Sequence, residues 1–141
     1  MTGTATTPTP ELTERAARIR LAITRTARRM RQEAGAELGP SAVAALATIE
    51  RAGPLTPSEL AKHERIQRPT ATRVLARLAE LGLVERTADP TDRRCSIVTI
   101  TAEGRALLKR LRSRKNAYLA RRMRKLPDDD VATLELSLIH I

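Results

Sequence analysis

Two short stretches of the sequence carry side chains that can recognise a nucleic acid. The first, RPTATR, places Arg68, Thr70, Thr72 and Arg73 within six residues. Arginine can bind guanine through two hydrogen bonds, and threonine offers a hydroxyl together with a methyl group that can contact thymine. The second, DPTDRR at 89–94, ends in two adjacent arginines. The first stretch predicts contacts to bases if it lies on a helix that can enter the major groove.

The second stretch is expected to form the tip of a β-hairpin. It lies between two short runs that are rich in β-branched residues, 83–87 and 95–101. The tip is either an inert solvated turn or a probe for the adjacent minor groove, whose negative potential in A·T-rich DNA favours arginine. In the second interpretation Arg94 enters the groove and Arg93 contacts phosphate. Asp89 and Asp92 brace the loop by hydrogen bonding to nearby backbone N–H groups or to an arginine.

The elements that must position these residues follow from capping signals. Thr56 is expected to cap a short helix, with Pro57 at its first position and Glu59 completing a capping box. After a turn near residues 63–67, a second helix carries RPTATR and ends at Gly82. Its expected buried stripe is Val74, Leu75, Leu78 and Leu81. The pattern predicts a helix–turn–helix followed by a β-wing; the alternative is a helical hairpin of purely structural purpose.

Helices are also expected on both sides of this unit. The first, at 11–33, has a narrow apolar stripe (Leu12, Ala16, Ile19, Ile23, Ala27, Met30) and many arginines, which either are solvated or intersubunit or contact DNA. A helix at 42–51 follows. Thr101 should cap a long helix at 102–125 with apolar members Leu107, Leu108, Leu111, Leu119 and Met123. A last helix, opened by Pro127 and three aspartates, should be short, with its apolar end exposed unless it packs across a dimer.

Composition narrows the class of protein. The net charge of +10 predicts a polyanionic partner, either nucleic acid or an anionic membrane surface. No apolar run approaches the roughly 20 residues that a membrane-spanning helix needs. With no Trp, no Phe and one Tyr, the core must be built by aliphatic packing, which suits a mostly helical fold.

Three residues have alternative roles in redox or metal chemistry. Cys95 is the single cysteine, which fits a reducing cytoplasm; it is either a small strand residue or a redox sensor. His63 and His140 lie far apart and at no spacing typical of zinc ligands, so we expect no metal. We also expect no cofactor and no enzymatic activity, because the sequence offers no nucleophile–base–acid set and no phosphate loop.

Four stretches taken together resemble the MarR family of bacterial winged-helix transcription regulators: LTPSELA, RPTATRVLARLAELGLVER, DPTDRR and ITAEGRALL. The resemblance runs from about residue 41 to residue 111. It implies a homodimer in which the terminal helices interlock and two winged helices grip a palindromic operator. It also implies a wing-tip pair, Asp92 and Arg94, a position near backbone and ligand, Arg86, and a recognition helix displaying Arg68, Thr70, Thr72, Arg73 and Arg77. Relatives often have arginine where this chain has Thr91, so the tip is expected to be held differently.

We therefore expect a mostly α fold with a small β-wing: a winged helix–turn–helix at 36–101, flanked by dimerisation helices at 11–35 and 102–141, after a disordered leader at 1–10. The expected function is sequence-specific regulation of transcription in the bacterial cytoplasm. The protein would repress from an inverted-repeat operator in double-stranded DNA and be released by a small anionic or phenolic ligand in an aliphatic pocket. The alternative is an architectural protein that coats DNA with little sequence preference, which charge alone would support.

Overall fold

The structure is a computed structural model that describes residues 6–35 and 37–141. In these residues the chain folds into six helices and one antiparallel pair of strands: α1 (Pro10–Ala34), α2 (Pro40–Ala52), α3 (Pro57–Glu64), α4 (Arg68–Glu80), β1 (Val84–Ala88), β2 (Ser96–Ile100), α5 (Ala102–Met123) and α6 (Asp128–Ile139). The expected mostly α fold with a β-wing is confirmed. Half of the expected leader, residues 1–5, lies outside the described residues, and α1 begins at Pro10 with Thr9 as its N-cap.

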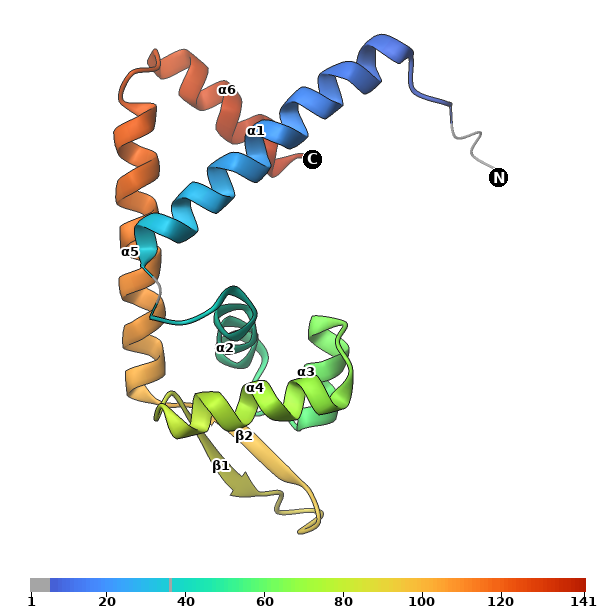
Figure 1. Cartoon of the computed structure of the whole chain (residues 1–141), viewed down its shortest axis with the longest axis vertical. Helices are drawn as coiled ribbons and strands as arrows, with labels where there is room; N and C mark the ends of the chain where they lie inside the picture. Colours follow the sequence, from blue (N-terminus) through green and yellow to red (C-terminus); the bar gives the residue numbers. More distant parts are fainter. Residues whose placement is uncertain (1–5, 36) are drawn as a thin grey trace.

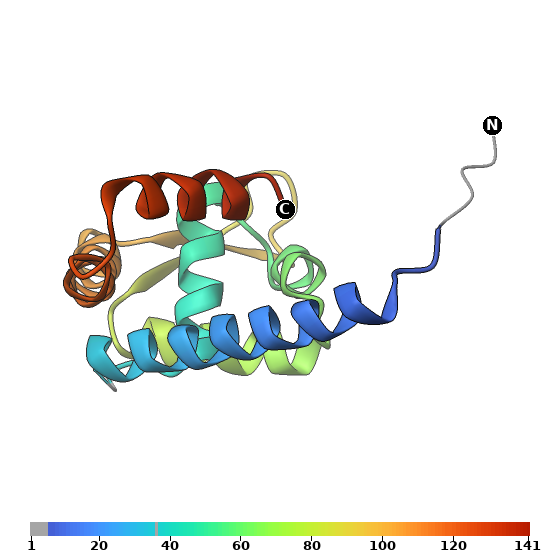
Figure 2. The same ribbon diagram turned by 90° about the horizontal axis from the view of Figure 1, so that it is seen from above.

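Helix α5 is the spine that joins two parts of the molecule (Figure 1). Its lower end belongs to a lobe with α2, α3, α4 and the β1–β2 hairpin, and its upper part packs against α1. Helix α6 turns back from the top of α5. The two terminal helices, α1 and α6, overlap in Figure 1, but Figure 2 shows from above that they run along opposite sides of the molecule.

The lobe encloses an aliphatic core. Its largest fully buried side chains come from all the elements of the lobe except β1: Leu46, Ile49, Leu60, Leu75, Leu78, Val98 and Leu108. On α4 the expected stripe is right for Leu75 and Leu78 and wrong for Leu81, which is 38% exposed. Leu81 caps the helix where the chain reverses through Gly82 (φ 74°), so it points out of the lobe. Ala71 is fully buried in the same row as Leu75 and Leu78.

The apolar stripe expected on α5 is correct only in its lower half. Leu107, Leu108 and Leu111 are buried against the lobe. Above them Leu119 and Met123 are half-buried, and Tyr118 is the buried residue instead. There α5 has left the lobe and packs mainly on α1, so a different face of the helix is covered.

The wing is joined to the lobe through the backbone of Val98. Val98 is opposite Arg86 in the β1–β2 pair, and its other edge exchanges hydrogen bonds of 2.7 and 3.1 Å with Leu55. Strand β1 is shifted by one residue from the expected 83–87, and β2 is one residue shorter at each end than the expected 95–101. Differences of this size are normal at the ends of elements. The hairpin therefore starts from a fixed base and projects away from the lobe (Figure 1).

The two expected threonine caps are present. The Thr56 hydroxyl accepts from the Glu59 N–H (3.2 Å) and donates to the Glu59 carboxylate (3.1 Å). The Thr101 hydroxyl accepts from the Gly104 N–H (3.1 Å) and donates to the Gly82 carbonyl (2.7 Å). Thr101 thus caps α5 and also ties its first turn to the start of the wing.

Gly104 is required by a close approach of α5 to the wing. A methyl group at this position would clash with the backbone carbonyl of Leu83 and would lie 2.7 Å from Cγ1 of Ile100. We predict that Gly104→Ala lowers the free energy of unfolding by about 1–3 kcal/mol, the usual cost of overpacking. The measurement is denaturant unfolding at one fixed protein concentration. Gly39→Ala is the matched control, because its added methyl meets only open space. Equal stability of the two variants would contradict the close approach.

Candidate nucleic-acid interface

The turn between α3 and α4 has a defined hydrogen-bonded geometry. Arg65 adopts a left-handed conformation (φ 53°, ψ 45°), which lets its N–H donate to the carbonyl of Lys62 and that of Ile66 to Ala61. This pattern is a Schellman motif, a common way to end a helix. Thr48 on α2 donates a hydrogen bond to the Glu64 carboxylate and so fixes the end of α3 to the lobe.

Burial of one face of α4 exposes the opposite face. Because Ala71, Leu75 and Leu78 point into the core, Thr72 and Arg73 point to solvent. Arg68 and Arg77 are also exposed, and Thr70 is half-buried at the edge of the face. The structure therefore brings the five expected recognition residues onto one helix, with four of them exposed.

The three arginines of this face differ in whether an acid pairs with them. Arg77 forms an ion pair with Glu80 (3.5 Å), but both side chains are more than 60% exposed, so the pair is weak. Among the residues that the structure describes, the ion pairs include neither Arg68 nor Arg73. Arg73 therefore keeps its full charge and its donors at the middle of the exposed face.

The wing tip is held by its two aspartates. Asp89 accepts hydrogen bonds from the N–H (2.9 Å) and the hydroxyl (2.8 Å) of Thr91. Asp92 accepts from the N–H of Arg94 (3.0 Å). The backbone bond from Asp89 N–H to the Cys95 carbonyl (2.9 Å) closes the loop. Thr91, where the resemblance leads us to expect an arginine, is thus the partner of Asp89.

These hydrogen bonds also change the chemistry of Asp89. The backbone N–H of Thr91, followed by its hydroxyl, holds the pKa of the Asp89 carboxyl below its ordinary value, because both donors favour the charged form. Arg93 and Arg94 are both exposed at the tip, and Arg86 is exposed on β1. Both acids of the tip bond to backbone or hydroxyl donors, so the guanidinium groups remain available to an outside anion.

The expectation that Cys95 is a strand residue is wrong. It is exposed in the bend before Ser96, where strand β2 begins, and its Sγ lies 3.7 Å from Oδ2 of Asp92. The Cys95 N–H bonds back to the Asp92 carbonyl (3.0 Å), so the loop turns before pairing with β1 can begin. His63 and His140 are both exposed, and no group of three metal-binding side chains occurs in residues 6–35 and 37–141.

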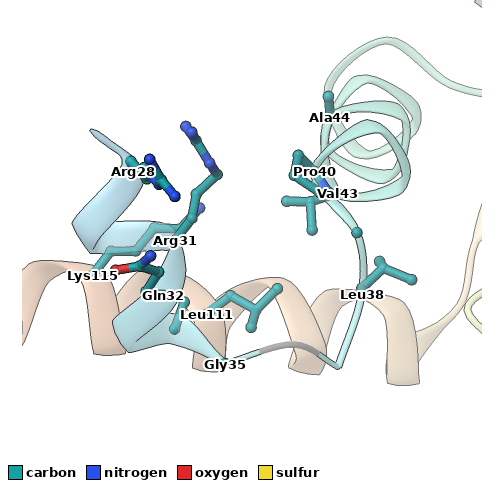
Figure 3. Close-up of a pocket in the computed structure, with 12 residues that line it drawn as sticks. Arg28, Arg31, Gln32, Gly35, Leu38, Pro40, Val43, Ala44, Leu111 and Lys115 are labelled. Carbon is teal, nitrogen blue, oxygen red and sulfur yellow. The ribbon is translucent and has the colours of Figure 1, made fainter. Parts of the chain in front are cut away.

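A second feature is a cavity between α5 and the lobe, whose lining residues the sequence did not identify. It has a volume of about 850 Å³ and lies where the α1–α2 connection passes α5. Arg28, Arg31 and Lys115 lie on one side, and Val43 and Leu111 are among the apolar lining residues (Figure 3). Its lining residues in the described chain include three cations and no acid. The cavity thus combines positive charge with an aliphatic wall.

A bundle of aliphatic helices that carries a helix–turn–helix and a basic β-wing defines a winged helix–turn–helix protein. The sequence profile of the MarR family matches residues 38–96. The uncharacterized HTH-type transcriptional regulator ML2140 of Mycobacterium leprae is 36% identical over 110 residues, 77% of each chain. The chain therefore belongs to the MarR family of HTH-type transcriptional regulators, which are DNA-binding proteins and not enzymes.

Other relatives agree with this assignment. The multiple antibiotic resistance protein MarR of Salmonella typhimurium is 37% identical over 94 residues, 66% of this chain and 65% of that protein. The crystal structure of apo MarR from E. coli superposes with a TM-score of 0.72 at 28% identity, over 89% of this chain and 94% of that one. A MepR mutant of S. aureus, bound to an oligodeoxyribonucleotide, shares the fold at 17% identity (TM-score 0.71; 89% and 93% covered).

None of the helices within the described residues is both long and apolar enough to cross a bilayer. Sequence reasoning missed three features of the site: the left-handed Arg65, the choice of Thr91 as the partner of Asp89, and the identity of the residues that line the cavity. The Asp-x-Thr spacing was a visible signal for the pair, because aspartate commonly accepts from the N–H two residues later. The other two have no local signal.

We predict that Asp89→Ala loosens the wing tip and leaves the lobe intact, because both bonds from Thr91 are lost. Amide hydrogen exchange of Thr91, followed by NMR, should become faster, whereas Asp89→Asn should keep part of the protection, because its amide oxygen accepts the same bonds but carries no charge. Since the pKa of Asp89 is lowered, the additional protection that the charge gives in the wild type should be complete above the ordinary value of 3.8 and be lost only as pH falls through the lowered pKa. Unchanged exchange in Asp89→Ala would show that the tip is held otherwise.

Proposed function

We propose that this protein is a repressor that binds an inverted-repeat operator as a homodimer and is released by a small anionic or phenolic ligand. The observation that carries the proposal is the exposed face of α4, centred on Arg73, in one lobe with the basic wing tip. MepR, which shares this fold, has been solved bound to an oligodeoxyribonucleotide, and this supports DNA as the partner.

Homodimer formation is supported by the apolar surface of the terminal helices. Large apolar side chains are exposed on both α1 and the end of the chain around α6: Leu12, Ile19, Leu21, Ile23, Leu134, Leu136, Leu138, Ile139 and Ile141. An exposed apolar surface of this extent is typical of a protein–protein interface. A symmetric dimer formed through α1 and α6 would bury this apolar surface and would give the protein two winged lobes.

Two lobes impose a geometric condition on the operator. Recognition helices that enter successive major grooves must lie about 34–36 Å apart, one turn of B-DNA. In our proposal Arg73, Thr70 and Thr72 contact base edges near the start of α4. Arg68 lies at the entry of the helix, and Arg77, one turn further on, contacts phosphate.

The wing would then read the neighbouring minor groove. We assign Arg94 to the groove, Arg93 and Arg86 to phosphates, and Asp92 to bracing the loop. The hydrogen bond from the Arg94 N–H to Asp92 supports this division, because it fixes the backbone of the residue that must point outward. A narrow A·T-rich groove attracts arginine without base-specific hydrogen bonds.

Ligand release is supported by the charged cavity. Arg28, Arg31 and Lys115 would bind the carboxylate or phenolate of a small ligand, and the aliphatic wall would cover its apolar part. The cavity is lined by α1, α5 and the start of α2, so a bound ligand can favour one angle between α1 and the lobe. It acts only through different affinity for the DNA-binding and released arrangements.

An architectural role remains the alternative function, and its support is the net charge of +10. Charge attracts any DNA through phosphate contacts and counterion release. Such a protein needs no particular side chains on α4. The threonines between the arginines therefore favour sequence-specific regulation over coating.

Competition binding at fixed salt tests the proposal. The wild type should prefer an inverted repeat from its own promoter over both a single half-site and random DNA. Arg73→Ala should reduce that preference by about 1–3 kcal/mol if a base contact is lost. Arg94→Ala should weaken binding and flatten the preference for A·T-rich flanks.

The same titrations separate the alternatives. Equal affinity for the inverted repeat and random DNA would support coating and contradict repression. Equal affinity for the inverted repeat and the half-site would contradict a dimer that spans both. A uniform loss on every sequence in Arg73→Ala would place this arginine on phosphate.

A simple aromatic carboxylate, benzoate, is the probe for the cavity. We predict that benzoate weakens operator binding by the wild type and that Arg31→Ala requires roughly tenfold more of it, in line with the loss of one charged hydrogen bond. Calorimetric titration without DNA gives the same comparison directly. Arg29→Ala is the matched control, because Arg29 lies on the same helix but pairs with Glu33 (3.4 Å). Equal benzoate sensitivity of the two variants would exclude Arg31 from the ligand site.

A further inference from the structure

Arg65 occupies the one position of the helix–turn–helix where its side chain is disfavoured. The left-handed conformation at the end of α3 suits glycine, because any Cβ crowds the neighbouring carbonyl oxygen there. Among the described residues Arg65 is the only one other than glycine with positive φ. The conformation of the turn therefore does not explain why an arginine, and not a glycine, stands at this position.

The turn does not use the guanidinium of Arg65. The Schellman hydrogen bonds come from the backbone N–H groups of Arg65 and Ile66, which any residue with an N–H can provide. Ile66 packs against the core and anchors the turn from the other side. The side chain of Arg65 is exposed, and within the described part of the chain no ion pair includes it.

The acid nearest in sequence is directed away from this surface. Glu64 is half-buried and accepts a hydrogen bond from Thr48 of α2. The exposed residues closest to Arg65 in the sequence are basic or neutral, among them Lys62 and His63 on the last turn of α3 and Arg68 at the start of α4; the exposed acid Glu59, one turn earlier on α3, hydrogen-bonds to Thr56. The turn between α3 and α4, called the elbow below, therefore carries several basic side chains next to the start of the recognition helix α4.

The position of this surface in the fold is fixed. The α3–α4 turn lies at the end of the lobe that is far from α5 in both views (Figures 1 and 2). When the start of a recognition helix enters the major groove, the helix that precedes it crosses the sugar–phosphate backbone. The elbow between the two helices then faces the strand that borders the groove.

We propose that Arg65 is a phosphate-binding residue that clamps the DNA backbone at the edge of the groove occupied by α4. The inference rests on the proposed docking of α4 in the major groove. Because the turn fixes the Arg65 backbone, its guanidinium is delivered to one phosphate with little loss of backbone freedom. The contact carries no sequence information and sets the depth and register of α4.

The salt dependence of DNA binding tests this proposal. Each phosphate contact contributes about 0.9 to the slope of log affinity against log salt concentration. Arg65→Gly should therefore make this negative slope shallower by about 0.9 for each protomer bound. The change should be the same on inverted-repeat and on random DNA. Arg65→Lys should keep the wild-type slope, since lysine also contacts phosphate as a point charge.

Two controls keep the result specific to this contact. Arg18→Gln removes the same charge from exposed α1 and should leave the slope unchanged. Thermal melting should show Arg65→Gly to be at least as stable as the wild type, because glycine suits the left-handed turn. An unchanged slope in Arg65→Gly, or a slope loss equal to that of Arg18→Gln, would overturn the proposal.

The random-DNA arm separates this inference from the proposed repressor function. If the wild type does not prefer the inverted repeat, repression fails, but a slope loss of Arg65→Gly on random DNA still supports a phosphate contact. A loss confined to the inverted repeat would indicate a base contact and would overturn the assignment. A lower melting temperature with an unchanged slope would mean that Arg65 serves the fold alone.

Discussion

Burial of Ala71, Leu75 and Leu78 is the constraint on which the interface depends. These three side chains fix the rotation of α4 about its own axis, because each is almost fully removed from solvent in a well-packed core. Once that face is committed, Thr72 and Arg73 must face outward. Rotating α4 to present a different face would bury an arginine without a partner, which is far costlier than any contact with DNA could offset.

The distribution of acids decides where the net positive charge is left free. Glu33, Glu37 and Glu50 pair with arginines of α5 or its neighbour α1: Arg29, Arg110, Arg112, Arg114 and Arg121. On the wing and elbow, Asp89, Asp92 and Glu64 accept bonds from backbone or hydroxyl donors. Part of the positive charge of α1 and α5 is thus paired with acids, whereas within the described residues no ion pair includes Arg65, Arg73 or Arg94, which are proposed to meet DNA.

Much of the interface was predictable because its signals are local. The Thr56 and Thr101 caps, the bounds of α4 and the position of the hairpin follow from contacts between residues at most a few positions apart. The predictions of buried residues failed where an element distant in the sequence decides which side chains are covered. Leu81 was expected in the core but is exposed at the chain reversal, and Tyr118 is buried because α1 crosses α5 there. Cys95 lies outside the strand because the Asp92 carbonyl turns the loop first.

The sequence by itself determined the helix–turn–helix, the wing and the candidate DNA-binding residues. It could do so because caps, helical periodicity and turn residues act within one or two turns of chain. Only the tertiary structure decided the use of Arg65, the direction of Glu64 and the cavity of Arg28, Arg31 and Lys115. Those features depend on backbone conformation or on segments separated by more than 15 residues. Periodicity does not encode how such segments approach, because that is set by the packing of the whole lobe.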